Sequence, residues 1–394
     1  MEVLFVHAGL PRPDDGSIRS WRALSWLAER HKVCLLPLYA DTARIIETPN
    51  LPAGVEVLDP LPLPQTWLGW LRQRLYPLPP REPLARLCRA VAHAAAHCDW
   101  LYLGWWALAV FNEVTSRPVT TWDWDSLSLW HLSAVRAARI IGFPKAALHF
   151  ENALCYLAFE RFLLRAHVLS APSLREAAWL YHVTRRPTVL VRNCVEMGRL
   201  KTAAERPPSE APPKVLFVGS LDYGPNRDGL RWFVTSVWPQ VLRRVHNAEL
   251  VIAGWRNRSS MPPELAQAKG ITLCENLPTP DLIKLYAQAR VFIAPIWYGG
   301  GIPNKVLEAA AAARPVVATT HIARAFSPLH PPFRVTDRST LFAAHIVAYL
   351  VHPDTADEAG RASRNWVREN YSEEQWNRDM ERLQQKVLAA LSGF

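Results

Sequence analysis

Short apolar runs alternate with amphipathic segments through the first half of the chain. One segment, 18–30 (IRSWRALSWLAER), has the spacing of a helix with one apolar face. Five segments have the length and composition of buried strands: 2–8 (EVLFVHA), 32–38 (KVCLLPL), 99–105 (DWLYLGW), 118–124 (PVTTWDW) and 167–172 (HVLSAP). This alternation predicts β-α-β units that build a parallel sheet.

The same alternation starts again after residues 205–214 (ERPPSEAPPK), a polar segment with four prolines. We expect helices at 227–245 and 280–289. The expected strands are 214–220 (KVLFVGS), 248–254 (AELVIAG), 291–296 (VFIAPI) and 315–319 (PVVAT). The sequence therefore predicts two doubly wound α/β domains, 1–204 and 205–370, joined by a proline-rich linker that could act as a hinge. Ligands of such sheets bind outside the carboxyl ends of the strands.

The carboxyl-terminal region predicts two helices that separate near 370–372. Ser372 is followed by Glu374 and Gln375, which favours a helix start, and an apolar stripe continues to Leu391. We expect the segment 371–394 to pack back on the first domain.

Residues 49–83 depart from this alternation because they contain nine prolines. Within them Trp67 and Trp70 lie close to Arg72 and Arg74, a pattern that a helix at a lipid surface would show. A helix packed on its own domain is the alternative, and we favour it because tryptophans of this kind usually belong to a core.

Composition narrows the class of protein. The 394 residues are 49% hydrophobic and 20% charged, as in globular proteins, and the six cysteines form no C-x-x-C pair. No apolar run approaches the roughly 20 residues of a membrane helix, and residues 1–10 do not resemble a signal peptide. We therefore expect a reduced, cytoplasmic protein, associated at most with the inner face of a membrane. The net charge of +10 favours anionic partners, but without a basic cluster we expect no nucleic acid.

The stretch 298–319 (YGGGIPNKVLEAAAAARPVVAT) is the strongest candidate for a binding site. Three glycines follow a predicted strand, and Pro303 is suited to the first position of the next helix. Unpaired N–H groups and the positive end of the helix dipole attract an anion there, and glycines let a phosphate approach the backbone. Lys305 could add a positive charge. Glu308 lies five residues beyond Pro303, about 7.5 Å along the axis, where a carboxylate could accept hydrogen bonds from the diol of a ribose.

Each piece of this stretch also has a structural interpretation. The glycines could form a tight turn, and Lys305 could pair with Glu308 on the surface of the helix. Because Gly219 and Gly254 end two neighbouring strands as well, the combination favours a nucleotide.

The carboxyl-terminal half resembles glycosyltransferase family four, the retaining nucleotide-sugar transferases of GT-B architecture. The resemblance rests on 215–233 (VLFVGSLDYGPNRDGLRWF), the stretch from 285 (LYAQARVFIAPIWYGGGIPNKVLEA) and 370–376 (NYSEEQW), and more weakly on 9–38. It implies two Rossmann-like domains that face each other across a cleft. It also implies transfer of a sugar from a nucleotide-sugar donor to a hydroxyl acceptor with retention, without a metal or other cofactor.

The resemblance assigns donor-binding roles to particular residues. Glu308 would bind the ribose as the second glutamate of the family's E-x7-E element, and Lys305 would lie near the phosphates. The other implied donor-side residues are Gly16, Gly219, Ser220, Asn226, Tyr298, Gly300, Gly301 and Ile302. The chain differs from the family at two of these positions, because Gly300 replaces the first glutamate and Ser220 replaces a frequent arginine.

Asp123 and Asp125 are the catalytic candidates, at the end of a predicted strand where the family commonly has a polar residue. Either could orient or polarise the acceptor hydroxyl, or could instead cap a helix that begins near Ser126. Glu160 fits a further family position, or forms a buried ion pair. Two alternatives to a transferase remain: a nucleotide-sugar epimerase, and a catalytically silent protein that binds nucleotide sugars.

Overall fold

The computed structural model describes residues 1–12, 18–39, 51–62, 81–104, 119–123, 125–160, 166–255 and 262–393. The chain divides into two compact units. Unit 1 comprises Met1–His131, Leu148–Arg192 and Asn377–Phe394, and unit 2 comprises Leu132–Ala147 and Asn193–Trp376. The division falls inside three helices, α4 (Leu127–Arg136), α6 (Phe143–Phe159) and α17 (Glu373–Leu391).

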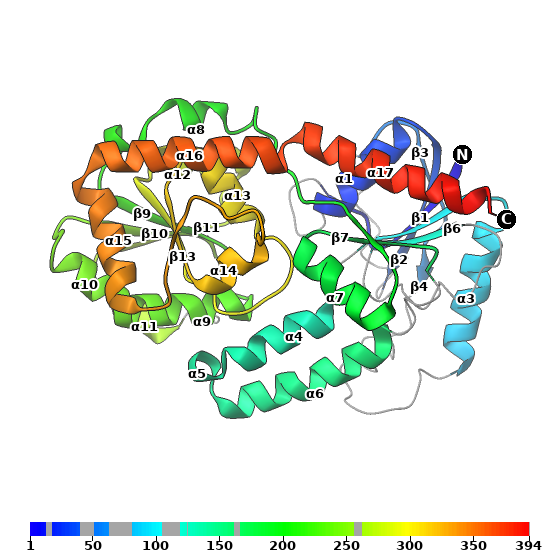
Figure 1. Ribbon diagram of the computed structural model, residues 1–394, viewed down its shortest axis with the longest axis horizontal. Helices are drawn as coiled ribbons and strands as arrows, with labels where there is room; N and C mark the ends of the chain where they lie inside the picture. The colour runs from blue at the N-terminus through cyan, green and yellow to red at the C-terminus, as the bar shows by residue number, and fades with distance from the viewer. Residues whose placement is uncertain are drawn as a thin grey trace. The chain divides into compact units, whose positions relative to one another are not determined.

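Unit 1 is built on a parallel sheet with the strand order β3-β2-β1-β5-β6-β7-β8, and β4 also pairs with β2 (Figure 1). The strands are β1 (Glu2–Ala8), β2 (Lys32–Tyr39), β3 (Val55–Val57), β4 (Leu61–Pro62), β5 (Trp100–Leu103), β6 (Val119–Asp123), β7 (Val168–Ala171) and β8 (Thr188–Leu190). Among the described residues, the helices that belong wholly to this unit are α1 (Ile18–Ala28), α3 (Arg81–Ala95) and α7 (Leu174–Thr184), and most of α17 (Glu373–Leu391) joins them.

Side chains of the unit 1 strands alternate between two faces. Leu4, Val6, Leu101 and Leu103 belong to one core cluster with Val91 of α3 and Leu180 of α7. Helix α1 packs against β1 and β2, and α17 lies beside it, with His31 Nε2 3.1 Å from Gln384 Oε1 (Figure 1).

Unit 2 holds a six-stranded parallel sheet with the order β11-β10-β9-β12-β13-β14. Its strands are β9 (Lys214–Val218), β10 (Glu249–Trp255), β11 (Ile271–Glu275), β12 (Val291–Ala294), β13 (Val316–Ala318) and β14 (Arg334–Val335). One face packs on α8 (Lys201–Glu205), α12 (Thr279–Gln288), α13 (Asn304–Ala311), α14 (Thr320–Ala325) and α16 (Pro353–Tyr371). The other face packs on α9 (Gly224–Trp232), η5 (Phe233–Val237), α10 (Trp238–Leu242), α11 (Pro263–Gln267) and α15 (Ser339–Val351). The helix α5 (Ala138–Ile141) lies against α9.

Two expected elements differ in the structure. The helix predicted over 227–245 is interrupted by the π-helical turn η5, immediately before Trp238 and Pro239 begin α10. Pro239 has no N–H to donate to the preceding turn, which explains the local change in hydrogen bonding. The strand predicted over 291–296 ends at Ala294, because Pro295 cannot continue the ladder of backbone bonds.

The proline-rich segment 205–214 lies inside unit 2. Pro208 is buried in the short helix η4 (Pro208–Glu210), and the Arg290 guanidinium donates to the carbonyls of Pro208, Ser209 and Ala211. A neighbouring buried guanidinium, that of Arg314, donates to four more carbonyls, those of Ala203, Arg206, Ala289 and Ala312. These bonds fasten the segment to the ends of three helices.

The two predicted carboxyl-terminal helices are present as α16 and α17. They separate at Ser372, whose hydroxyl accepts a hydrogen bond from the backbone N–H of Gln375 at 3.4 Å. The side chains of the predicted stripe are buried from Trp376 to Val387.

Candidate functional site

The glycine run 299–301 lies at the point in the unit 2 sheet where the strand order reverses. The strands β9 and β12 are neighbours there, and the chain continues from β9 toward one edge of the sheet and from β12 toward the other. Ligands of doubly wound sheets bind at such switch points. Gly219 follows β9 and the glycine run follows β12, so both predicted glycine segments lie at this position.

Several backbone N–H groups are unpaired at the start of α13. Among the described residues, no acceptor bonds the N–H groups of Gly300, Ile302, Asn304 or Lys305. Pro303 is the N-cap of α13, one position before the first-turn position that we expected. Its extended backbone, with ψ 99°, keeps it outside the helix, and Asn304 begins the first turn. Unpaired donors of this kind and the positive end of the helix dipole favour an anion at this position.

Glu308 is buried in α13, with 7% of its surface exposed. Lys305 Nζ lies 3.1 Å from its Oε1 and 3.0 Å from its Oε2, so the two side chains form the pair that was one of our alternatives. The Tyr286 hydroxyl donates to Oε2 at 3.0 Å. The pKa of Tyr286 is well above its ordinary value, mainly because the phenol is buried and also because it lies beside the Glu308 carboxylate. This phenol therefore remains a hydrogen-bond donor.

Asn226 has a clear role in the loop after β9. Its Nδ2 donates to the carbonyl of Ser220 at 2.9 Å, and a Cβ on Gly219 would lie 2.5 Å from the same nitrogen. Ser220 Oγ in turn accepts from the backbone N–H of Asp222 at 3.3 Å. The structure thus brings Gly219, Ser220 and Asn226 together in one loop, where Asn226 occupies the space that a side chain at 219 would need.

Two side chains fix the start of the glycine run. Tyr298 is buried, and its hydroxyl donates to Asp228 of α9 at 2.8 Å. Ser133, from the part of α4 that belongs to unit 2, accepts from the N–H of Gly299 at 2.9 Å and donates to its carbonyl at 3.0 Å. These contacts assign Tyr298 to the support of the loop, since its hydroxyl is already bonded to protein.

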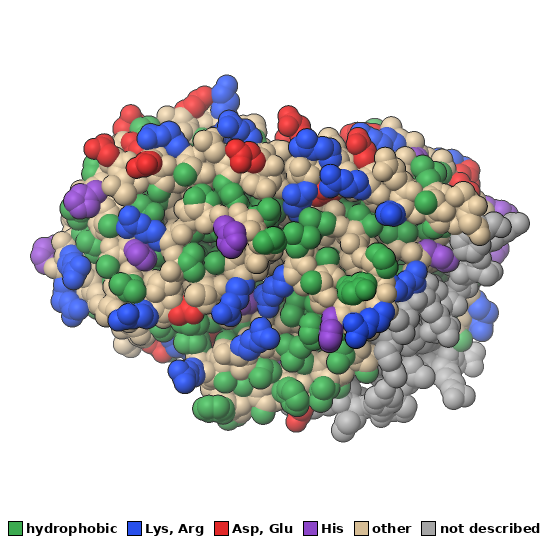
Figure 2. Space-filling view, in the orientation of Figure 1, with side chains coloured by type: hydrophobic (Ala, Val, Ile, Leu, Met, Phe, Trp, Pro, Cys, Tyr) green, Lys and Arg blue, Asp and Glu red, His purple; other side chains and the backbone are tan. Residues whose placement is uncertain are grey.

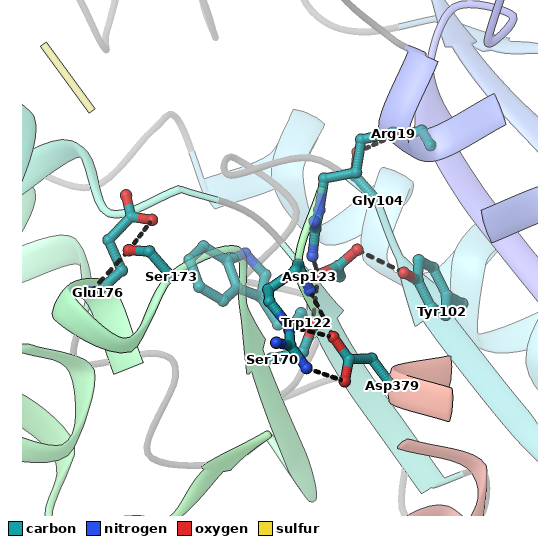
Figure 3. A network of polar contacts seen from close by, with 11 residues as sticks. Arg19, Tyr102, Gly104, Trp122, Asp123, Ser170, Ser173, Glu176 and Asp379 are labelled. Carbon is teal, nitrogen blue, oxygen red and sulfur yellow. Dashed lines mark hydrogen bonds and ion pairs between the residues drawn. The ribbon is translucent and has the colours of Figure 1, made fainter. Parts of the chain in front are cut away.

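In unit 1, Asp123 is the centre of a buried polar network (Figure 3). Its Oδ1 accepts from Arg19 and from Ser170, both at 2.5 Å, and its Oδ2 accepts from Tyr102 at 2.5 Å. Burial acts to lower the pKa of Arg19, but the contact with Asp123 raises it above its ordinary value. Asp123 therefore orients Arg19 and Tyr102 at the carboxyl edge of the sheet, and it does not cap a helix.

Asp125 differs from Asp123 because no described residue donates a hydrogen bond to it. It is partly buried, and burial raises the pKa of its carboxyl to about 6, with Arg19 acting in the opposite direction and Asp123 in the same direction. A carboxylate with a pKa in this range and no bonded partner can accept a proton near neutral pH. Of the two catalytic candidates, Asp125 is the one whose oxygens accept no hydrogen bond from the described residues.

The helix α4 is capped by Ser126 and Glu160. Ser126 Oγ accepts from the N–H of Leu129 at 3.2 Å, while Glu160 accepts from the hydroxyls of Ser126 and Ser128 at 2.7 and 2.6 Å. Burial raises the pKa of Glu160, although these hydrogen bonds act against the shift. Glu160 is thus bonded to a hydroxyl network that supports the start of α4, and residues 161–165, on which the alternative of an ion pair depended, lie outside the described residues.

Several residues near the candidate sites carried no signal in the sequence. Tyr286 and Arg199 flank Glu308, and Ser133 holds Gly299, although each lies far from its partner along the chain. Gly16 lies outside the described residues, as do Trp67 and Trp70.

Residues 212–351 match the sequence model of the family described as Glycosyl transferases group 1. An uncharacterized 44.6 kDa protein in the cps region of Klebsiella pneumoniae is 28% identical over 164 residues, which cover 40% of this chain and 42% of that protein. The match therefore spans less than half the length of that relative.

Three solved structures are similar over almost the whole chain. Sucrose-phosphate synthase from Thermosynechococcus elongatus has a TM-score of 0.70 at 17% identity and covers 99% of this chain and 100% of its own. Anabaena Alr3699/HepE in complex with UDP and glucose has a TM-score of 0.63 at 14% identity, covering 98% and 99%. The structure described as trehalose-6-phosphate from E. coli bound with UDP-2-fluoro glucose has a TM-score of 0.67 at 10% identity, also covering 98% and 99%. The chain therefore has the fold of the GT-B glycosyltransferases, with two Rossmann-like halves, as its sequence predicted, and its residues 212–351 match glycosyl transferases group 1.

Proposed function

We propose that the protein is a glycosyltransferase that moves a sugar from a nucleotide-sugar donor to a hydroxyl acceptor. The observation that carries the proposal is the start of α13, where four unpaired N–H groups lie at the switch point of the sheet and Lys305 and Glu308 follow in the same helix. A diphosphate would bind the N–H groups, and the ribose diol would bind Glu308. Anabaena Alr3699/HepE was solved with UDP and the E. coli structure with UDP-2-fluoro glucose, and these two complexes support a donor of this class.

The chemistry would be transfer with retention and without a metal. The leaving diphosphate would accept the proton of the attacking hydroxyl on the same face of the sugar, so no protein nucleophile takes part. The backbone donors and Lys305 would stabilise the negative charge that develops on the leaving group. Asp125 would accept a hydrogen bond from the acceptor hydroxyl, and Asp123 would act indirectly by holding Arg19 and Tyr102.

The experiment is incubation with a panel of nucleotide sugars, with and without hydroxyl acceptors, while nucleotide release is measured. Release that depends on an acceptor supports a transferase. Tight nucleotide binding without any release would contradict it and favour the silent binding protein. Interconversion of donor sugars without nucleotide release would favour the epimerase.

Substitution of Glu308 tests the site itself. Charge-assisted hydrogen bonds contribute roughly 1.5–3 kcal/mol, so Glu308→Ala should weaken nucleoside diphosphate binding by about 10- to 100-fold in calorimetry. Glu358→Ala, on the exposed face of α16, is the matched control and should bind as the wild type does. Unchanged affinity of the Glu308 variant would refute the ribose assignment.

Peripheral contact with a membrane is also proposed, because a lipid-linked acceptor would require it. No described helix is long and apolar enough to span a bilayer. Along α6, Phe143, Phe150 and Leu154 are 77%, 49% and 53% exposed, and Figure 2 shows hydrophobic side chains over this helix. Such residues can insert between lipid headgroups.

Binding to anionic vesicles, followed by sedimentation, tests this contact. Phe150→Ser combined with Leu154→Ser should reduce the fraction of protein bound to vesicles. The interfacial helix predicted from the sequence is tested in the same way by Trp67→Ser combined with Trp70→Ser. Serine at Leu341 and Val351, which are exposed in unit 2, serves as the control. Equal binding by all variants would contradict the contact.

A further inference from the structure

Two cations lie beside the single carboxylate of Glu308. Lys305 contacts both carboxylate oxygens, and Arg199 Nη2 lies 3.7 Å from Oε1. That distance permits an ion pair but exceeds the length of a hydrogen bond. The group of three therefore has a surplus positive charge, and Arg199 holds the weaker of the two contacts.

The two cations differ in their surroundings. The Lys305 side chain is 43% exposed, whereas that of Arg199 is 29% exposed and its Nε is buried without a hydrogen-bond partner. The Lys305 ammonium is a compact charge on a flexible stem, while a guanidinium can present two parallel N–H groups to a carboxylate. Lys305 can thus leave Glu308 at little cost. The guanidinium of Arg199 has unbonded N–H groups with which it can take the place of Lys305 at the carboxylate.

The chain also places Arg199 along the start of α13. Asn193 Nδ2 donates to the Ile302 carbonyl at 3.1 Å and to Asn304 Oδ1 at 2.8 Å, so the segment that begins at residue 193 is fixed to the loop before the helix. Arg199 lies farther along the same segment, next to Glu308. Its position is therefore tied to the same backbone that carries the unpaired donors.

We propose that Arg199 is a positioning residue that takes over the Glu308 carboxylate when a nucleoside diphosphate binds. This inference rests on the proposed function. Lys305 leaves Glu308 for the diphosphate, Arg199 closes on the carboxylate, and Tyr286 keeps its bond to Oε2, so that Glu308 presents its remaining lone pairs to the ribose diol. The Glu308 carboxylate keeps a cationic partner in both states: Lys305 before binding, and Arg199 afterwards, when Lys305 pairs with phosphate.

The need for a second cation follows from the burial of Glu308. A carboxylate that is 7% exposed and loses its only close cation would be left with one phenol donor. Buried charges are strongly unfavourable without a partner. Arg199 removes that penalty. Its positive charge also lies in the same domain as Ser220, the position where the family frequently has an arginine.

The test compares nucleotide affinities by calorimetry, with UDP, GDP and ADP as probes and the 2′,3′-dideoxy form of whichever binds most tightly. The wild type should prefer the ribose form by about tenfold, the value of one good hydrogen-bond contact to a charged group. Lys305→Met should lower affinity for both forms but retain the ribose preference, because Arg199 remains with Glu308. Arg199→Gln should reduce the preference to below about threefold, and Arg199→Lys should restore part of it.

A double-mutant cycle gives a second measurement. In Arg199→Gln, Lys305 stays with Glu308 and contributes less to the diphosphate, so Lys305→Met should cost less affinity in that background than in the wild type. Additive effects, a Lys305 variant without ribose preference, or an Arg199→Gln variant that keeps it would each overturn the inference and leave the proposed function intact. A folded wild type that binds none of the three diphosphates would overturn the proposed function and this inference with it.

Discussion

Replacement of Asp125 by asparagine should change how the stability of the protein depends on pH. The carboxyl has a pKa of about 6 in the folded chain, against 3.8 for an ordinary aspartate, so the folded state holds the proton more tightly than the unfolded state. Stability then falls as the pH rises through this interval, because ionisation is easier in the unfolded chain. A difference of roughly two pKa units corresponds to about 3 kcal/mol in the free energy of unfolding.

The assay is urea unfolding, followed by circular dichroism, of the wild type and of Asp125→Asn from about pH 4 to about pH 7. Asparagine does not ionise, so the wild type should lose up to about 3 kcal/mol relative to the variant across this range. The loss should appear in the transition of unit 1, since Asp125 belongs to that unit. A difference that is constant with pH, or a wild type that gains stability relative to the variant, would refute the raised pKa.

The same carboxyl should control the acid limb of activity. If ionised Asp125 accepts a hydrogen bond from the acceptor hydroxyl, the rate should fall as the pH drops below about 6. Asp125→Asn should lose most activity at neutral pH and should lack this limb. Full activity in the variant would remove Asp125 from the mechanism without affecting the stability argument.

Two further predictions concern buried contacts in unit 2. Arg314 is fully buried and donates to four carbonyls, and burial lowers its pKa to about 10. Arg314→Met would leave these acceptors without their donor, so the free energy of unfolding in urea should fall by roughly 3–5 kcal/mol. Arg243→Met, at the exposed C-cap of α10, is the surface comparison. Ser133→Ala would leave the buried N–H of Gly299 unbonded, which should lower the free energy of unfolding by about 1–3 kcal/mol. The variant should also bind nucleoside diphosphate more weakly in calorimetry. Affinity equal to that of the wild type would show that the glycine run keeps its conformation without this contact.

The central strands of both sheets could be predicted closely because their signal is local, whereas the short or edge strands β3, β4, β8, β11 and β14 were not predicted. The segment EVLFVHA coincides with β1, and KVCLLPL differs from β2 by one residue, since apolar alternation and length are enough to identify a buried strand. The interruption of the helix at Pro239 was harder to foresee. A proline reveals where a helix is disturbed, but the form of the disturbance depends on packing.

The side-chain partners of the candidate site could not be predicted, because they join distant segments. Nothing in the spacing of Arg199 and Glu308, or of Ser133 and Gly299, marks them as neighbours. The two aspartates show the same limit: Asp123 and Asp125 are two residues apart, yet one accepts three hydrogen bonds and the other accepts none from the described residues. Their difference arises from the sheet around them, which the sequence does not display.

The close approach of α9 to the chain after β12 has a consequence for laboratory evolution of this protein. A Cβ on Gly229 would lie 2.2 Å from the Pro295 carbonyl oxygen, so any side chain there would push α9 away. Asp228, the partner of Tyr298, is the neighbouring residue, and the glycine run would lose its anchor at the same time. Libraries that seek new ligand preferences should therefore keep Gly229 and Gly219 constant and diversify positions whose side chains already reach solvent, such as Tyr223.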